Sequence, residues 1–168
     1  MAQHYGNSMM SRSRFQPGEK LKQNGMTLLE LVTVIAIVGI LAAIAYPSYV
    51  GQIRKSKRAV AKSTLLDAAN REEQYFFNNR AYTGTLTDLG YPSPAYFGDD
   101  NAPSSAAKAV YQLTLTAVNS GAGTCGTDPA PCFQATATPQ HDQANDTACG
   151  TFTLTSSNTK GAAGSDCW

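Results

Sequence analysis

The hydrophobic residues are concentrated in one segment near the start of the chain. Residues 26–50 carry a single charge, that of Glu30, and apolar side chains fall on all sides of a helix drawn through them. From Met26 to Tyr49 this helix would be roughly 36 Å long, which exceeds the ~30 Å hydrocarbon core of a bilayer. The pattern therefore predicts a membrane-inserting helix with a kink at Pro47.

The helical pattern continues beyond this segment with a different character. Residues 51–78 are rich in good helix formers. A narrow apolar stripe is expected at Ala61, Leu65, Ala69 and Phe76. Asp67 and Arg71 are spaced for an ion pair on the outer surface. Residues 26–78 thus predict one helix of roughly 80 Å, lipid-compatible in its first half and amphipathic in its second.

The remaining residues, 79–168, predict a globular head. Glycines and prolines recur through residues 79–108, which predicts a long irregular loop. Strict alternation of apolar and polar residues then predicts half-buried strands at 110–118, 132–138 and 151–155. The expected fold class is α+β: a long N-terminal helix whose apolar half protrudes, and whose second half covers a small antiparallel sheet formed within residues 109–168.

Composition and motifs narrow the classes of function. The chain has 168 residues, of which 42% are hydrophobic and 15% charged, with a formal net charge of +1. A charged fraction below the usual ~25% argues against a charge-rich disordered protein and a histone-like nucleic-acid binder. No GxSxG, HExxH or P-loop motif occurs, and His141 and the Asp99-Asp100 pair lie in polar turns. We therefore expect no enzyme activity, no metal site and no cofactor.

All four cysteines follow the membrane segment, and none forms a CxxC pair. Zinc-type spacing to a histidine is also missing from the sequence, so two disulfides in an oxidising compartment are favoured over a metal site. Four cysteines allow three pairings. The favoured pairing is Cys125–Cys132, around a turn with two prolines, and Cys149–Cys167, which would hold the tail beside the last strand; the other two pairings stay open.

Residues 1–25 form a polar, basic leader. The apolar stretch that follows is longer than the 7–15-residue core of a secretory signal, so cleavage would precede the helix and leave it on the mature chain. Removal of residues 1–25 would change the formal side-chain charge from +1 to −2. Within the membrane helix the Glu30 carboxylate is costly. Either the carboxylate reaches the interface between membrane and water, or it meets a cation in a protein assembly. An α-amine freed by cleavage at Gly25 would be such a cation.

The junction, KQNGMTLLE at residues 22–30, resembles the class III signal of type IV prepilins. Gly39 and Pro47 also match that family's spacing, whereas Met26 stands where the family usually has Phe. The resemblance implies cleavage after Gly25 by a prepilin peptidase and N-methylation of Met26. It also implies that Glu30 pairs with the N-terminal amine of a neighbouring subunit, and that the helix loses helicity between Gly39 and Pro47 in the filament.

Three further segments resemble minor pilins of the PilE type: NREEQYFFNNRAYTGTLTDLGYP, FQATATPQHDQANDTACG and TFTLTSSNTKGAAGSDCW. In that group a disulfide-closed loop is bracketed at the positions of Cys149 and Cys167. The resemblance implies a minor pilin acting in pilus assembly, twitching motility and adhesion. Its partners would be other pilin subunits, the prepilin peptidase and the inner-membrane assembly machinery. The alternatives are a major pilin, a DNA-uptake pilin and a type II secretion pseudopilin, which commonly lacks that loop.

Basic residues flank both ends of the membrane segment, so the positive-inside rule gives no orientation. The cysteines favour a head on the oxidising side of the membrane, periplasmic or extracellular. The resemblance implies a Gram-negative inner membrane with the head in the periplasm before assembly, and an extracellular pilus after it. The cluster RKSKR at residues 54–58 lacks interleaved aromatics. A solvated helix face or contacts to lipid headgroups explains it more simply than DNA, so nucleic acid is the less favoured partner.

Overall fold

The computed structural model describes residues 25–168. These residues fall into two compact units, one ending at Leu41 and one formed by Ala42–Trp168. The helix α1 (Leu28–Asn79) contributes residues to both units. Its bounds lie within two residues of the predicted 26–78, and Pro47 lies inside it. The prediction of one long helix is therefore confirmed.

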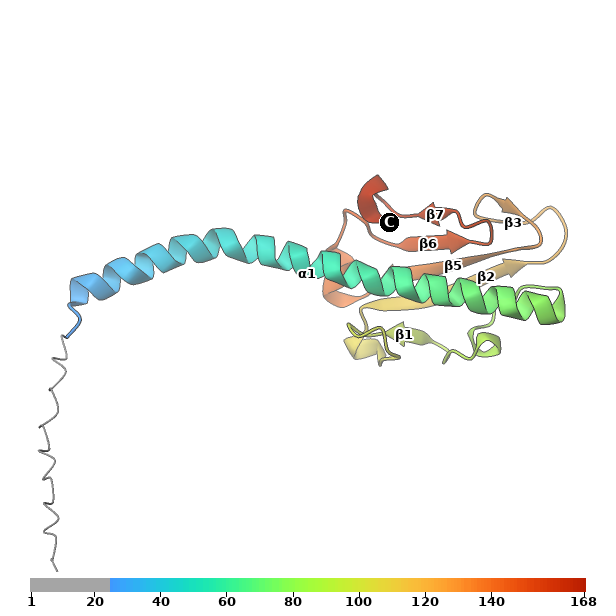
Figure 1. Ribbon diagram of the computed structural model, residues 1–168, viewed down its shortest axis with the longest axis horizontal. Helices are drawn as coiled ribbons and strands as arrows, with labels where there is room; N and C mark the ends of the chain where they lie inside the picture. The colour runs from blue at the N-terminus through green and yellow to red at the C-terminus, as the bar shows by residue number, and fades with distance from the viewer. Residues whose placement is uncertain (1–24) are drawn as a thin grey trace, which may run out of the picture. The chain divides into compact units, whose positions relative to one another are not determined.

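The second unit contains a five-stranded antiparallel sheet in the order β1-β2-β5-β6-β7 (Figure 1). Its strands are β1 (Ala95–Phe97), β2 (Tyr111–Val118), β5 (Cys132–Pro139), β6 (Phe152–Thr155) and β7 (Lys160–Gly161). A small hairpin of β3 (Thr124–Cys125) and β4 (Asp128–Pro129) lies between β2 and β5 in the chain. The short 3₁₀ helices are η1 (Leu86–Leu89), η2 (Ala106–Lys108), η3 (His141–Asn145) and η4 (Ser165–Cys167).

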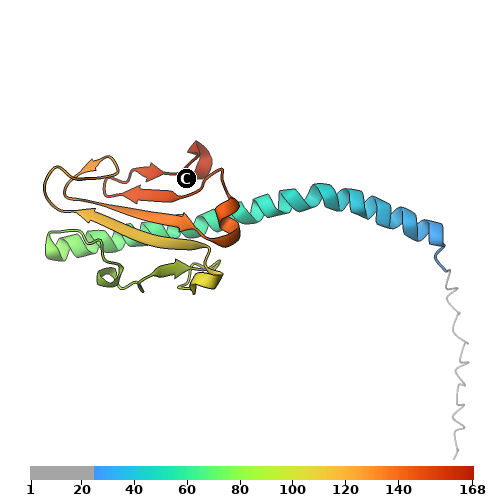
Figure 2. The same ribbon diagram turned by 180° about the vertical axis from the view of Figure 1, so that it is seen from behind.

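The second half of α1 lies across one face of this sheet (Figures 1 and 2). Alternation along β2 sets which residues face the helix: Leu113 and Leu115 are buried, whereas Thr114 and Thr116 are exposed. Strands β2 and β5 pair over eight residues each and form the middle of the core. The three predicted strands and the α+β fold class are confirmed.

The predicted apolar stripe on α1 is only partly correct. Ala61 and Leu65 are fully buried, but Ala69 and Phe76 are half-buried, and the inward positions after Leu65 belong to Ala68 and Glu72. Repeated steps of four residues drift by about 40° around a helix at each step. Steps of four, three and four residues, as from Ala61 through Leu65 and Ala68 to Glu72, stay on one face of the helix. Glu72 was not predicted to lie on this buried face because its side chain is charged.

The prediction of a loop without regular structure over residues 79–108 is wrong. This segment contains η1, β1 and η2, and β1 pairs with β2, with Ala95 opposite Leu113. Tyr91 and Phe97 are buried in the core with their rings 6.0 Å apart. The strand is three residues long and lies between Pro94 and Gly98, so it is too short to show a period of two.

Candidate functional site

The helix α1 begins with a side-chain cap. The Thr27 Oγ1 atom accepts a hydrogen bond from the Glu30 N–H (3.2 Å), and the Thr27 carbonyl accepts from the Leu31 N–H (3.1 Å). This is the arrangement of an N-cap residue, which satisfies an amide that a helix leaves unpaired at its start. The motif Thr-Leu-Leu-Glu therefore fixes the first helical residue at Leu28.

The residues expected at the processing site lie just before this cap. Gly25 and Met26 lie outside the helix, and Met26 is 67% exposed. Glu30 lies in the first helical turn and is exposed, and within residues 25–168 no cation pairs with its carboxylate. The rest of the expected leader, residues 1–24, lies outside the described part of the chain. The structure thus leaves Glu30 available to a partner from another molecule.

Gly39 has no packing role within the described chain. A Cβ atom added there would meet no atom within 4 Å. Glycine in the middle of a helix costs roughly 1 kcal/mol relative to alanine. Helix α1 continues through both Gly39 and Pro47 in this single subunit. The loss of helicity expected for the filament remains a prediction about the assembled state.

The first half of α1 is apolar and unburied. Every large hydrophobic side chain from Leu28 to Tyr49 is exposed. By length and composition, α1 is the one helix in residues 25–168 that could cross a membrane, and none of its most apolar 18-residue stretch is buried. An apolar surface of this extent requires lipid or other protein around it.

The basic cluster at residues 54–58 is partly neutralised by the head. The half-buried Lys57 places its Nζ atom 3.3 Å from the carboxylate of the exposed Asp99. Arg58 forms two bonds to Asp146, at 2.7 and 2.8 Å, with side chains only 15% and 5% exposed. Arg54 and Lys55 form no ion pair within residues 25–168. The cluster therefore offers less positive charge to a ligand than its sequence indicates.

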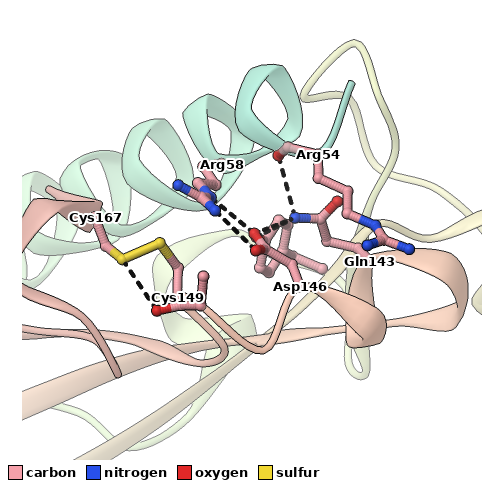
Figure 3. A network of polar contacts seen from close by, with 8 residues as sticks. Arg54, Arg58, Gln143, Asp146, Cys149 and Cys167 are labelled. Atoms are coloured by element: carbon pink, nitrogen blue, oxygen red, sulfur yellow. Dashed lines mark hydrogen bonds and ion pairs between the residues drawn. A yellow bond between two sulfur atoms is a disulfide. The ribbon is translucent and has the colours of Figure 1, made fainter. Parts of the chain in front are cut away.

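Arg58 and Asp146 form the centre of a polar network that fixes η3 to α1 (Figure 3). The Arg58 guanidinium holds the pKa of Asp146 below its usual value, because it donates hydrogen bonds to the ionised carboxylate. Gln143 Nε2 lies near three acceptors: Asp146 Oδ2 and Tyr111 Oη, both at 3.1 Å, and the Arg54 carbonyl at 3.3 Å. Sequence reasoning missed this network because its partners are 88 residues apart.

A second set of polar contacts fixes the segment that follows α1. The Asp67–Arg71 ion pair is present at 2.9 Å, as predicted, and the Tyr91 hydroxyl donates to Asp67. The Glu72 carboxylate is fully buried and accepts the Thr83 N–H at 3.0 Å, and its other oxygen has no partner in the described residues. Burial raises the pKa of Glu72 to about 7.

Two disulfides close loops in the C-terminal part of the head. Cys125 is bonded to Cys132 and Cys149 to Cys167, the pairing that the cysteine positions favoured. Beside the first disulfide, Asp128 accepts hydrogen bonds from the Ser156 hydroxyl and from the N–H and hydroxyl of Ser157. These bonds lower the pKa of Asp128 to about 2. In the described residues, no three His, Cys, Asp or Glu side chains converge as metal ligands.

Two family models match adjacent parts of the chain. Residues 20–46 match the prokaryotic N-terminal methylation motif, and residues 47–153 match type IV minor pilin ComP, DNA uptake sequence receptor. A long helix packed on an antiparallel sheet, preceded by a methylation motif, defines the type IV prepilin class. The chain belongs to the family of the second model, which covers more than half of it.

Relatives from several bacteria each match less than half of the chain. The type IV major pilin PilA of Myxococcus xanthus is 35% identical over 82 residues, 49% of this chain and 36% of that protein. The type IV major pilin PilE1 of Neisseria gonorrhoeae is 39% identical over 74 residues, 43% and 44% of the two chains. The type II secretion system core protein G of Aeromonas hydrophila is 36% identical over 71 residues, 42% and 50%.

The matched regions span about a third to a half of these curated relatives. The relatives are structural subunits by their descriptions, which fits the expectation that this chain is not an enzyme. Two of the three are described as major pilins and one as a secretion-system protein, while the family model is that of a minor pilin. The chain is therefore a type IV pilin.

Proposed function

We propose that this chain is a minor subunit of a type IV pilus, acting in pilus assembly and in pilus-dependent twitching motility and adhesion. The match of residues 47–153 to a minor-pilin family model carries this proposal. The relatives described as major pilins match only 49% and 43% of this chain, so they say less about its rank than a family model that covers residues 47–153. The Cys149–Cys167 loop favours a pilin over a pseudopilin.

Maturation takes place at the junction before the helix cap. A prepilin peptidase cleaves after Gly25 and methylates the new N-terminus at Met26. The exposed position of both residues, and the match of residues 20–46 to a methylation motif, support this step. Cleavage creates an α-amine four residues before Glu30, whose carboxylate has no partner in the described chain. Glu30 then pairs with the N-terminal amine of a neighbouring subunit.

Assembly exchanges one apolar environment for another. Before assembly the first half of α1 is held in the inner membrane with the head in the periplasm, where the two disulfides form. In the extracellular pilus the same apolar surface packs against other pilins. Because lipid and protein interiors are similarly apolar, this exchange gives little hydrophobic preference. The cost of an unpaired carboxylate in such a core makes Glu30 a determinant of register.

Gene deletion separates the three ranks of subunit. Loss of the main fibre protein would identify a major pilin, and loss of enzyme secretion would identify a pseudopilin. We expect fewer surface fibres while the fibre protein is still made. Mass spectrometry of sheared fibres should then show this chain as a minor component, cleaved after Gly25, methylated at Met26 and with all four cysteines oxidised.

DNA binding is a second candidate function, favoured by the description of the matched family as a DNA uptake sequence receptor. Fewer residues of the basic cluster 54–58 are available to bind DNA than the sequence indicates, because Lys57 and Arg58 already pair with acidic residues. The test is binding of duplex DNA by the mature chain at increasing salt. Phosphate contacts predict a steep loss of affinity with salt. Absent or salt-insensitive binding would exclude this function.

A further inference from the structure

A groove of about 380 Å³ lies between α1 and η3, at the end of the apolar half of the helix. One wall is apolar and belongs to α1. This wall consists of Tyr46, Val50 and Ile53. The rest of the lining is polar and comes from both elements. It consists of Arg54, Lys57, Asp142 and Gln143. The groove therefore combines an apolar strip with two cations, a carboxylate and an amide.

The amide in this groove carries an unmet hydrogen-bond acceptor. Gln143 is 2% exposed, and its Oε1 atom is buried with no partner among residues 25–168. Its orientation is fixed because Nε2 faces the Arg54 carbonyl and the Asp146 carboxylate, which only accept hydrogen bonds. A buried acceptor without a donor is unfavourable by roughly 1–3 kcal/mol. A hydroxyl group of a ligand bound in the groove could donate the missing hydrogen bond.

Of the two cations in the groove, Arg54 is available to bind an anion. The Arg54 side chain forms no ion pair in the described residues, whereas Lys57 shares its charge with the exposed Asp99. Arg54 follows Tyr46 by eight residues along α1, a rise of about 12 Å. Since the apolar segment ends near Tyr49, Arg54 lies at the depth of lipid headgroups whenever that segment spans a bilayer.

We infer that this groove binds the headgroup of an anionic phospholipid that carries hydroxyl groups, such as phosphatidylglycerol. Arg54 and Lys57 bind the phosphate, and a headgroup hydroxyl donates to Gln143 Oε1. The upper part of an acyl chain lies along Tyr46, Val50 and Ile53. This inference rests on the proposed membrane-held state of the subunit before assembly. The bound lipid then fixes the depth of the head relative to the membrane surface.

Duplex DNA fits the groove less well, although it also carries phosphates. A phosphodiester backbone has no apolar group to place against the apolar wall of the groove. The Asp142 carboxylate beside the two cations would also repel a second phosphate. Gln143 is too deeply buried for a wide duplex to reach. A single headgroup is small enough to enter between α1 and η3, where its hydroxyls can also donate to the exposed Asp142 carboxylate.

The test is native mass spectrometry of the full chain extracted from membranes in detergent, with phosphatidylglycerol and phosphatidylcholine added in equal amounts. Phosphatidylglycerol should be retained selectively. Arg54→Ala should weaken its retention about fivefold, the effect of one cation at a membrane surface. Lys55→Ala is the matched control, because it removes the same charge at the same depth but does not line the groove. It should retain the lipid.

A matched lipid tests the role of Gln143. Phosphatidylmethanol has the same charge as phosphatidylglycerol but lacks the headgroup hydroxyls, and its retention should be about two- to tenfold weaker, the effect of one hydrogen bond. Equal retention of both lipids would overturn the assignment to Gln143. Equal losses in the Arg54 and Lys55 variants would show a general surface charge and overturn the groove as the site.

Two further measurements separate this inference from other outcomes. If Arg54→Ala abolishes binding of duplex DNA and leaves lipid retention unchanged, the cation serves nucleic acid and the lipid site is wrong. If the wild-type chain appears in sheared fibres but retains no phosphatidylglycerol, this inference fails while the proposed pilin function stands. Unchanged thermal unfolding of each variant shows that the fold is intact.

Discussion

Along α1, residues 28–49 expose every large hydrophobic side chain, whereas residues 60–72 bury their inward face against the sheet. The second region is completed within the subunit by β2, β5 and β6. The first region has no such cover in residues 25–168, and its only charge lies at Glu30. A single helix therefore combines a segment that specifies the fold with one whose partners are lipid or other subunits. Changes in one region should leave the function of the other intact.

The largest expected effect comes from Gly25→Val. A β-branched residue at the scissile bond restricts the backbone and adds bulk, so the chain should remain an unprocessed, unassembled precursor. The intact mass of the membrane-bound protein measures this. Gly51→Val is a suitable control, because a Cβ atom at Gly51 meets nothing within 4 Å. Cleaved Gly25→Val protein in sheared fibres would contradict the proposed maturation.

Glu30→Ala should permit cleavage but reduce incorporation into fibres at least about tenfold, since a neighbour's amine would lose its buried partner. Glu30→Gln separates charge from volume and should fail similarly. The ratio of this chain to the main fibre protein in sheared fibres is the readout. Thermal unfolding of the head should not change. Normal incorporation of the alanine variant would remove the assigned role of Glu30.

Asp146→Ala should affect the opposite region. It leaves the Arg58 guanidinium, whose side chain is only 15% exposed, without its partner, which should lower the free energy of unfolding by about 3 kcal/mol. Chemical unfolding of the mature chain in detergent measures this. Lys57→Ala breaks only the pair with the exposed Asp99 and should cost about 0–1 kcal/mol. Cleavage after Gly25 should be normal in both variants, and a processing defect would show that the two regions are coupled.

The head should also become less stable as the pH rises. Burial raises the pKa of Glu72 to about 7 from 4.5, and the nearby Glu73 and Asp88 carboxylates add to this shift. The folded chain therefore binds a proton that the unfolded chain has released between these values. The contribution is full below about pH 4.5 and is lost as the pH rises through 7, by up to about 3 kcal/mol.

Glu72→Gln should flatten this pH dependence, since the amide oxygen still accepts the Thr83 N–H and carries no charge. Glu73→Gln removes only a smaller cause of the Glu72 pKa shift and should therefore weaken the pH dependence much less. Unfolding midpoints measured from pH 4 to pH 8 test both variants. An unchanged slope in Glu72→Gln would assign the dependence to another group.

The smallest expected difference lies between the two disulfides. Cys149–Cys167 closes a loop with a sequence separation of 18, against 7 for Cys125–Cys132. Loop-closure entropy predicts that removing the longer loop costs about 1 kcal/mol more. Paired Cys→Ser variants compared by chemical unfolding measure this difference. A larger loss for the Cys125–Cys132 pair would show that the β3–β4 hairpin depends on more than loop length.

The periodic parts of the fold were predictable from the sequence. Helix α1 and strands β2, β5 and β6 extend over enough residues to show their periods, and each was predicted within two residues of its observed start. Strands β1 and β7 are three and two residues long, so pairing with a neighbour defines them rather than their own pattern. Glu72 was missed because a buried carboxylate looks like a surface residue in a sequence.

The candidate sites also differ in whether the sequence alone could predict them. Gly25, Met26 and Glu30 lie within six residues and were found as one motif. Arg58, Gln143 and Asp146 come from two elements that only folding brings together. Local sequence carries no signal for such a network, because each residue alone is an ordinary polar side chain on a helix or in a loop.

The Thr27 cap determines which backbone near this terminus is non-helical and therefore accessible to an enzyme. Because the helix starts at Leu28, the peptide bond between Gly25 and Met26 stays outside the helical hydrogen-bond ladder. Proteolysis favours exposed backbone that is free of regular structure. The cap thus keeps the apolar helix from extending back over the bond at which we propose cleavage.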